Sequence, residues 1–176
     1  MIFFVMTEKK RGRGRPKGAP NKPKMELVTE RKQLTNDADV YEIFCQANIV
    51  AEESEENAVN GLRTFNDRNG AVRFLLQWVF DDNINSTLPK GKTPYNEDGA
   101  PASDLAPTSL RFETRQFKYF VTEEIPQIRR ETMWIQLLEG IPAKEAELLE
   151  LVKEKVWPFK NITKELAQKA FPEHIN

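Results

Sequence analysis

The fold of this chain is decided by the stretch AVRFLLQWVFD, residues 71–81. Apolar side chains occupy nearly every position of this stretch, so a helix formed from it is apolar almost all round. Such a helix has no polar face to turn toward water and is stable only where other elements surround it. The stretch therefore predicts a central helix, about residues 71–81, around which the rest of a folded domain packs.

Apolar residues also recur at helical spacing on both sides of this central helix. The further helices predicted from that spacing cover about residues 38–53, 54–66, 109–122, 125–139, 142–155 and 164–171. Asn36 or Asp37 is expected to cap the first, Ser54 to start the second, and Thr163 to cap the last. No segment alternates apolar and polar residues in the manner of a strand. The sequence predicts a compact all-α domain of about six to seven helices, with a long irregular loop over residues 83–107 that is either functional or mobile.

Charge divides the chain into two parts. The 176 residues include 26 Lys or Arg and 27 Asp or Glu, but residues 1–24 hold eight of the basic residues and a single acid, Glu8. The remaining 18 basic and 26 acidic residues leave residues 25–176 with a net charge of −8, against +7 for the first 24. Like charges, Gly and Pro oppose packing. We therefore predict a disordered basic arm, residues 1–35, and an acidic helical domain, residues 36–176.

The centre of the basic arm, Arg13-Gly14-Arg15-Pro16, resembles the AT-hook, a short DNA-binding motif. The narrow minor groove of A·T tracts carries an enhanced negative potential that attracts inserted Arg side chains. A glycine lets the backbone approach the groove floor, and the proline keeps the preceding residue extended. The expected DNA-binding residues are this core and the basic flanks that would contact phosphates, namely Lys9, Lys10, Arg11, Arg13, Gly14, Arg15, Pro16, Lys17, Lys22 and Lys24.

A simpler interpretation of the arm stays open. A basic tail without a defined structure binds any polyanion, including RNA or an acidic protein surface, and Ala19-Pro20-Asn21 interrupts the charge after the core. Eight phosphate contacts would give a salt slope of at most about −7. One short arm buries little surface, so by itself we expect it to bind weakly.

Other motifs in the chain indicate structural roles. Gly91-Lys92-Thr93 ends like a phosphate-binding loop, but the preceding glycine is missing and Pro94 follows at once. The two helices joined near Gly140 could suggest a helix-turn-helix. The second of them carries Glu145, Glu147, Glu150 and Glu154. Phosphates would repel such an acidic recognition helix, so ordinary helical packing is the better interpretation.

Catalytic and metal-binding constellations are not evident in the sequence. One His, His174, and one Cys, Cys45, cannot form a zinc site, and Cys45 is expected to be a small buried core residue. We therefore expect no enzyme activity, no metal, no cofactor and no small-molecule substrate. No stretch approaches the roughly 20 apolar residues of a membrane helix. The single cysteine suits a reducing compartment.

Three blocks of the domain resemble a small uncharacterised family of large contractile-tailed phages, including phages of cyanobacteria. The blocks are RFLLQWVFD (residues 73–81), LPKGKTPY (88–95) and QLLEGIPAKEAEL (136–148), and the closing ITKEL (162–166) and AFP (170–172) are similar too. The resemblance covers roughly residues 38–173. It implies a viral origin and no particular activity.

These observations lead to two expectations for function. The first is a DNA-binding accessory protein of the phage type, whose arm contacts the minor groove of A·T-rich DNA while the helical body binds a protein partner or a second copy. The alternative is a virion structural or assembly protein, whose arm contacts packaged DNA or an acidic neighbour. The expected location is the host cytoplasm, on bacterial or viral DNA, or else the virion.

Overall fold

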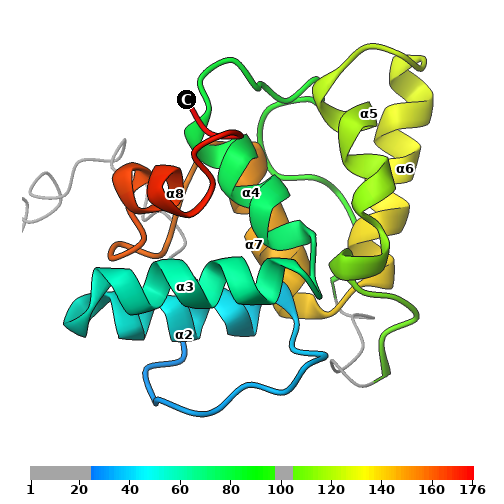
Figure 1. Ribbon diagram of the computed structural model, residues 1–176. Helices are drawn as coiled ribbons and strands as arrows, with labels where there is room; N and C mark the ends of the chain where they lie inside the picture. The colour runs from blue at the N-terminus through cyan, green and yellow to red at the C-terminus, as the bar shows by residue number, and fades with distance from the viewer. Residues whose placement is uncertain (1–24, 98–104) are drawn as a thin grey trace, which may run out of the picture.

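The computed structural model describes residues 25–97 and 105–176 of the chain (Figure 1). Within these ranges the chain forms seven α-helices and two short 3₁₀ helices, and no strand. They are α2 (Val40–Glu53), α3 (Glu55–Asn66), α4 (Ala71–Phe80), η2 (Leu110–Phe112), η3 (Thr114–Gln116), α5 (Phe117–Val121), α6 (Gln127–Gly140), α7 (Ala143–Lys153) and α8 (Lys164–Ala170). The predicted all-α class is confirmed.

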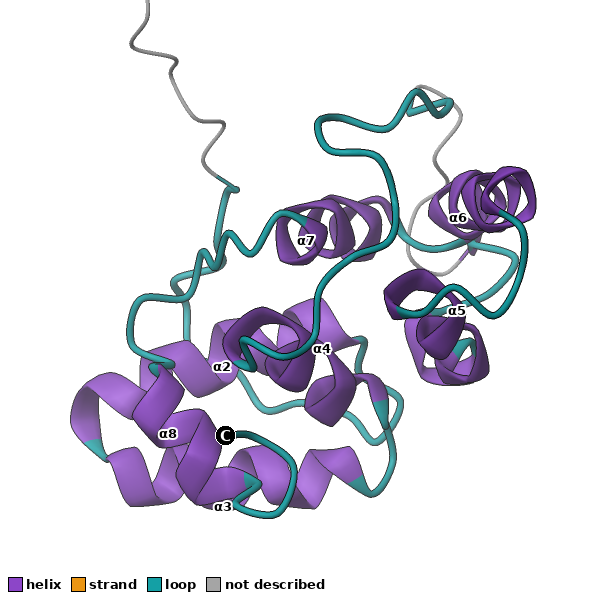
Figure 2. Cartoon of the chain, turned by 90° about the horizontal axis from the view of Figure 1, so that it is seen from above, coloured by secondary structure: helices purple, strands orange, loops and turns teal. Residues whose placement is uncertain are grey.

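Helix α4 is central, as its apolar sequence predicts. It contacts α2, α3, α7 and α8, while α6 packs on α7 and on the short α5. Seen from above, α2, α3 and α8 lie on one side of the molecule and α5 and α6 on the other, with α4 and α7 between them (Figure 2).

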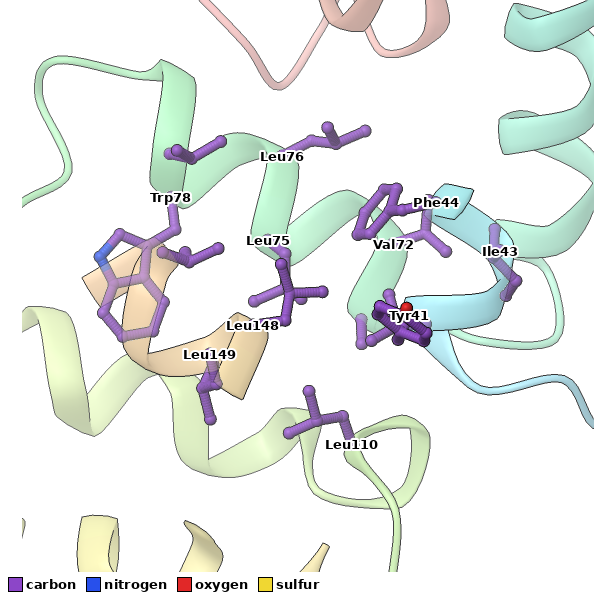
Figure 3. Packing of buried hydrophobic residues seen from close by; sticks show 14 of the residues in the cluster. Tyr41, Ile43, Phe44, Val72, Leu75, Leu76, Trp78, Leu110, Leu148 and Leu149 are labelled. Atoms are coloured by element: carbon purple, nitrogen blue, oxygen red, sulfur yellow. The ribbon is translucent and has the colours of Figure 1, made fainter. Parts of the chain in front are cut away.

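The core forms where α4 meets its neighbours. Val72, Leu75 and Leu76 of α4 are fully buried. Figure 3 shows Val72 beside Phe44 of α2, and Leu75 beside Leu148 of α7. Burying an aliphatic side chain of this size contributes about 1.5–3 kcal/mol, so each of these three residues stabilises the fold through α4.

The start of α2 differs from the prediction. Its N-cap is Asp39, not Asn36 or Asp37, because Asp39 forms a capping box: its carboxylate accepts from the Glu42 amide at 2.9 Å, and the Glu42 side chain accepts from the Asp39 amide. Ser54 joins α2 to α3 as predicted. Its amide donates to Val50 at the end of α2, and its hydroxyl accepts from the Asn57 amide at 3.2 Å.

The predicted helix 109–122 is wrong as a single element. The structure has η2, η3 and α5 in its place, with a break at Glu113, whose φ of −109° and ψ of 12° are not α-helical. The segment is shaped by contacts from elsewhere, because Leu110 is fully buried and its amide donates to the Glu145 carboxylate at 3.1 Å. Such long-range contacts override a local helical preference.

The predicted boundary of the arm at residue 35 is also wrong for its last part. Residues 25–35 lie along α2 instead of lacking packed structure. Met25 is buried, and the Tyr41 hydroxyl donates to the Glu26 carbonyl at 2.6 Å. The Gln46 side chain donates to the Glu30 carbonyl and accepts from the Lys32 amide, both at 2.9 Å. Side chains of α2 thus satisfy the polar backbone of this extended segment, and residues 25–35 belong to the packed domain.

Candidate functional site

All ten predicted DNA-binding residues, Lys9 to Lys24, lie outside the residues that the structure describes. Their assignment stays a prediction. The described part of the chain defines the point at which the arm joins the body, since the next residue, Met25, is only 6% exposed.

The arm's attachment point lies beside the start of α7. Tyr41, which holds the Glu26 carbonyl, has the ammonium group of Lys144 5.9 Å from its ring centre. Burial raises the pKa of the Tyr41 hydroxyl, so it stays a neutral donor to that carbonyl at physiological pH. The arm therefore starts from a fixed position on the body.

The described part of the chain is acidic as a whole. It includes 18 Lys or Arg and 24 Asp or Glu. A surface with this excess of carboxylates repels the phosphate backbone, while it can attract cationic partners. By charge alone, residues 1–24 favour anionic partners and the rest of the chain favours cationic ones.

A groove of about 800 Å³ runs between α2, α3 and the extended residues 31–34. Its lining includes the apolar side chains of Ile43 and Val50 from α2 and Phe65 from α3, beside polar ones. It also includes charges of both signs, Arg31 and Lys32 from the extended segment and Glu53 from α2. The groove is large enough to receive side chains of a protein partner. Sequence periodicity could not reveal it, because it depends on the return of residues 31–34 along α2.

Gly61 of α3 leaves open space in this groove. A Cβ atom built on Gly61 would have no atom within 4 Å outside the glycine's own neighbourhood. Glycine within a helix costs about 0.5–1 kcal/mol relative to alanine. A larger side chain at Gly61 can therefore fill the groove without a clash inside the protein.

The loop that follows α4 is held firmly by α7. The Lys153 ammonium group, whose side chain is 2% exposed, donates to the carbonyls of Pro89 at 3.0 Å and Gly91 at 2.6 Å. Glu150 accepts from the amide of Thr93 at 2.7 Å and from its hydroxyl at 2.8 Å. The first part of the predicted irregular loop is therefore ordered by specific hydrogen bonds.

This loop resembles a phosphate site only in sequence. Both donors of Thr93 are already bound to the Glu150 carboxylate, and the Trp134 indole N–H donates to the Thr93 hydroxyl at 3.0 Å. The adjacent cavity measures only about 90 Å³. Glu150 and Lys153 are three residues apart and share one face of α7, where they form an ion pair. This spacing is a sequence signal that predicts such a pair.

Glu145 is fully buried, which its sequence context does not indicate. The sequence shows it as one of the acids of a helix that would repel DNA. Its carboxylate accepts from the amides of Val40 at 3.2 Å and Leu110 at 3.1 Å and from the Ser109 hydroxyl at 3.2 Å. Burial raises the pKa of Glu145 to about 7, against the opposing effect of these hydrogen bonds. Glu145 thus links α2, α7 and the segment before α5.

Within residues 25–97 and 105–176, no group of three His, Cys, Asp or Glu side chains is arranged to hold a metal ion. The same ranges contain no helix long and apolar enough to cross a membrane. Cys45 is buried as predicted, and His174 is exposed.

The chain was compared with known protein families, curated proteins and solved structures. The model of a family of unknown function, DUF6433, matches residues 46–157. This range contains the three blocks quoted above and runs from α2 to just beyond α7. No curated protein and no solved structure matches the chain.

Proposed function

The chain belongs to the DUF6433 family, whose function is unknown, and we propose that it is a DNA-binding accessory protein of the phage type. Its AT-hook-like arm contacts the minor groove of A·T-rich DNA, and its helical body binds a protein partner or a second copy. The observation that carries the proposal is the separation of charge, +7 in residues 1–24 against −8 in residues 25–176.

The position of the arm supports this division of roles. Met25, the residue that follows the basic stretch, is buried in the acidic body. Phosphates are attracted by the arm and repelled by most of the body, so DNA is expected to engage the arm first. The Arg13 and Arg15 side chains would enter the minor groove on either side of Gly14, while the flanking lysines contact phosphates.

The α2–α3 groove supports the second half of the proposal. It is lined by apolar, polar and charged side chains together, which is the composition of a moderately polar protein interface. If a second copy occupies it, sedimentation will show a concentration-dependent dimer that Gly61→Leu disrupts. A monomer at all concentrations would leave a different protein as the occupant.

The DNA contact is tested with the full chain and two double variants of equal charge. Arg13→Ala/Arg15→Ala removes the two groove-inserting side chains, and Lys22→Ala/Lys24→Ala removes two flanking charges. Binding to A·T-rich and G·C-rich duplexes is measured at two salt concentrations. We expect Arg13→Ala/Arg15→Ala to abolish the preference for A·T-rich DNA. Lys22→Ala/Lys24→Ala should weaken binding to both duplexes and leave that preference in place.

The salt dependence gives an independent measurement. Each double variant is expected to reduce the slope of log affinity against log salt by about 2, since each phosphate contributes about 0.9. Equal binding of both duplexes by the unaltered protein would refute the AT-hook-like contact and leave a general polyanion-binding tail.

The alternative, a virion structural or assembly protein, is favoured by the same groove, because a component of a particle needs a surface for neighbouring proteins. Detection of the protein in purified phage particles would support it. Absence from particles, together with early expression, would support the accessory role.

A further inference from the structure

The groove between α2 and α3 contains both small and large apolar residues. Helices α2 and α3 lie side by side (Figure 1), and Ala47, Ala58 and Gly61 leave room between them and the strap of residues 31–34. Val50 and Phe65 line the same groove and remain partly exposed. The volume of about 800 Å³ is within the range of pockets that enclose a bound molecule. The described residues thus leave apolar side chains accessible to an occupant.

Four glutamates lie where α2 passes into α3, and we call them the acidic turn. Glu52 and Glu53 end α2, Glu55 and Glu56 begin α3, and all four are exposed. Glu53 also lines the groove. Glu55 forms an ion pair with Lys169, whereas none of the ion pairs within the described ranges involves the other three. The acidic turn therefore attracts cations to this end of the groove.

The first residues of the chain have a sequence that complements the groove and the acidic turn. Ile2-Phe3-Phe4-Val5 is a run of apolar residues, and Lys9-Lys10-Arg11 follows it closely. Phe3 and Phe4 are the only aromatic residues among the first 24, so they contribute nothing to the charge that favours DNA. Apolar side chains of this size are stabilised by removal from water. An apolar run followed by cations is the pattern that an apolar-lined groove with an acidic end fits.

The chain is long enough to bring this segment to the groove. Tyr41 of α2 holds the Glu26 carbonyl, which ties the described end of the chain to the helix that lines the groove. Residues 6–24 separate Val5 from Met25 and span up to roughly 65 Å when extended. Helix α2, with 14 residues, is only about 21 Å long. A flexible tether of this kind gives a millimolar effective concentration, so the chain's own segment is favoured over that of a second copy.

We propose that residues 2–5 pack into the α2–α3 groove and Lys9, Lys10 and Arg11 lie against the acidic turn, a closed state that holds the arm away from DNA. In this state three of the basic residues expected on phosphates are engaged by glutamates. A protein that takes the groove releases the arm, and DNA that binds the arm opens the groove, because coupling between two sites is reciprocal. The inference rests on the proposed DNA contact and groove, and adds their regulation.

The first test measures NMR order parameters of backbone amides in the full chain. Residues 3–5 should have values near about 0.85, as in a packed backbone. Gly61→Leu fills the groove and should lower them below about 0.6, the range of a flexible chain. The matched control is Gln136→Leu, which adds the same side chain at an exposed position of α6, on the other side of the molecule (Figure 2). This control should leave the order parameters unchanged.

The second test changes the segment and leaves the body intact. Phe3→Ser/Phe4→Ser should shift the methyl signals of Ala47 and Ala58, and Phe3→Leu/Phe4→Leu, which keeps the apolar character, should preserve the order of residues 3–5. The serine variant should also bind A·T-rich duplex more tightly, by about tenfold if nine-tenths of the molecules are closed. Its salt slope should steepen by about 2.7, at about 0.9 for each of three released cations.

The closed state is overturned if residues 3–5 of the unaltered protein have order parameters below about 0.6, or if the serine variant leaves both methyl signals in place. Order that appears only at high concentration, together with a dimer in sedimentation, would assign the segment to a second copy and overturn it too. The order of residues 3–5 is measured without DNA, so it does not depend on the A·T preference that Arg13→Ala/Arg15→Ala tests. The two proposals can therefore fail separately.

Discussion

Glu145 makes the stability of this protein depend on pH in a direction opposite to that of most carboxylates. Burial raises its pKa from the ordinary value of 4.5 to about 7. The folded protein therefore binds one more proton than the unfolded chain between these two pH values. Stability from this group is fully present below about pH 4.5 and is lost as the pH rises through 7.

The magnitude follows from the size of the pKa change. One pKa unit corresponds to about 1.4 kcal/mol, so the rise from 4.5 to 7 corresponds to about 3 kcal/mol of unfolding free energy. That is a substantial fraction of the 5–15 kcal/mol typical of a whole domain. It is isolated by comparing the protein with Glu145→Gln, whose side chain does not titrate.

The expected result is a difference between the two proteins that changes with pH. Glu145 faces three donors with its two side-chain oxygens, and two of these donors are backbone amides. A Gln side chain has one oxygen and turns its NH2 group toward a donor. At low pH the substitution should therefore be destabilising by about 1–3 kcal/mol. By pH 8 the two stabilities should converge, because the unaltered protein then keeps an ionised carboxylate buried.

The assay is urea unfolding followed by tryptophan fluorescence at half-unit steps from pH 4.5 to 8. Glu147→Gln, which removes a partly exposed carboxylate from the same helix, corrects for the general loss of charge. A difference between Glu145→Gln and the unaltered protein that stays constant within about 0.5 kcal/mol over this range would refute the reasoning. An NMR titration of the Glu145 carboxyl carbon with a midpoint near 7 would confirm the cause directly.

Three further substitutions test the local structure by urea unfolding. Gly91 has a φ of +92° with nothing near a Cβ, so Gly91→Ala should cost about 1 kcal/mol through the backbone alone, and an unchanged midpoint would contradict that conformation. Lys153→Met should cost about 2–3 kcal/mol because the carbonyls of Pro89 and Gly91 lose their donor, and hydrogen exchange of the loop amides should quicken. Asp39→Ala should cost about 1 kcal/mol, while Asp37→Ala should cause no comparable loss; the reverse order would restore the cap expected from sequence.

Much of the secondary structure could be predicted from local periodicity. Helices α2, α3, α4, α6, α7 and α8 each match a predicted segment to within a few residues. The Ser54 and Thr163 side chains cap their helices as expected, accepting from Asn57 and Leu166. These features depend on residues three or four apart, whose spacing is written in the chain itself.

The errors share a different cause. Asn36, Asp37 and Asp39 all have side chains that can cap a helix, so the residue type does not identify the N-cap of α2. The reciprocal hydrogen bond from the Asp39 amide to the Glu42 side chain identifies Asp39. Residues 25–35 look disordered by composition, but side chains of α2, among them Tyr41, Glu42 and Gln46, supply partners that order them. The segment 109–122 has a helical pattern that the distant Glu145 interrupts at its start.

The amino-acid sequence alone predicts the all-α class, the central place of residues 71–81 and the separation of a basic N-terminal stretch from an acidic remainder. Each follows from composition or from short-range spacing. Contacts between distant parts of the chain bury Glu145, form the groove between α2 and α3, and leave Phe112 exposed. The physical reason is that burial is a property of contacts between residues far apart in the chain, such as the 105 positions between Val40 and Glu145, and no local pattern records them.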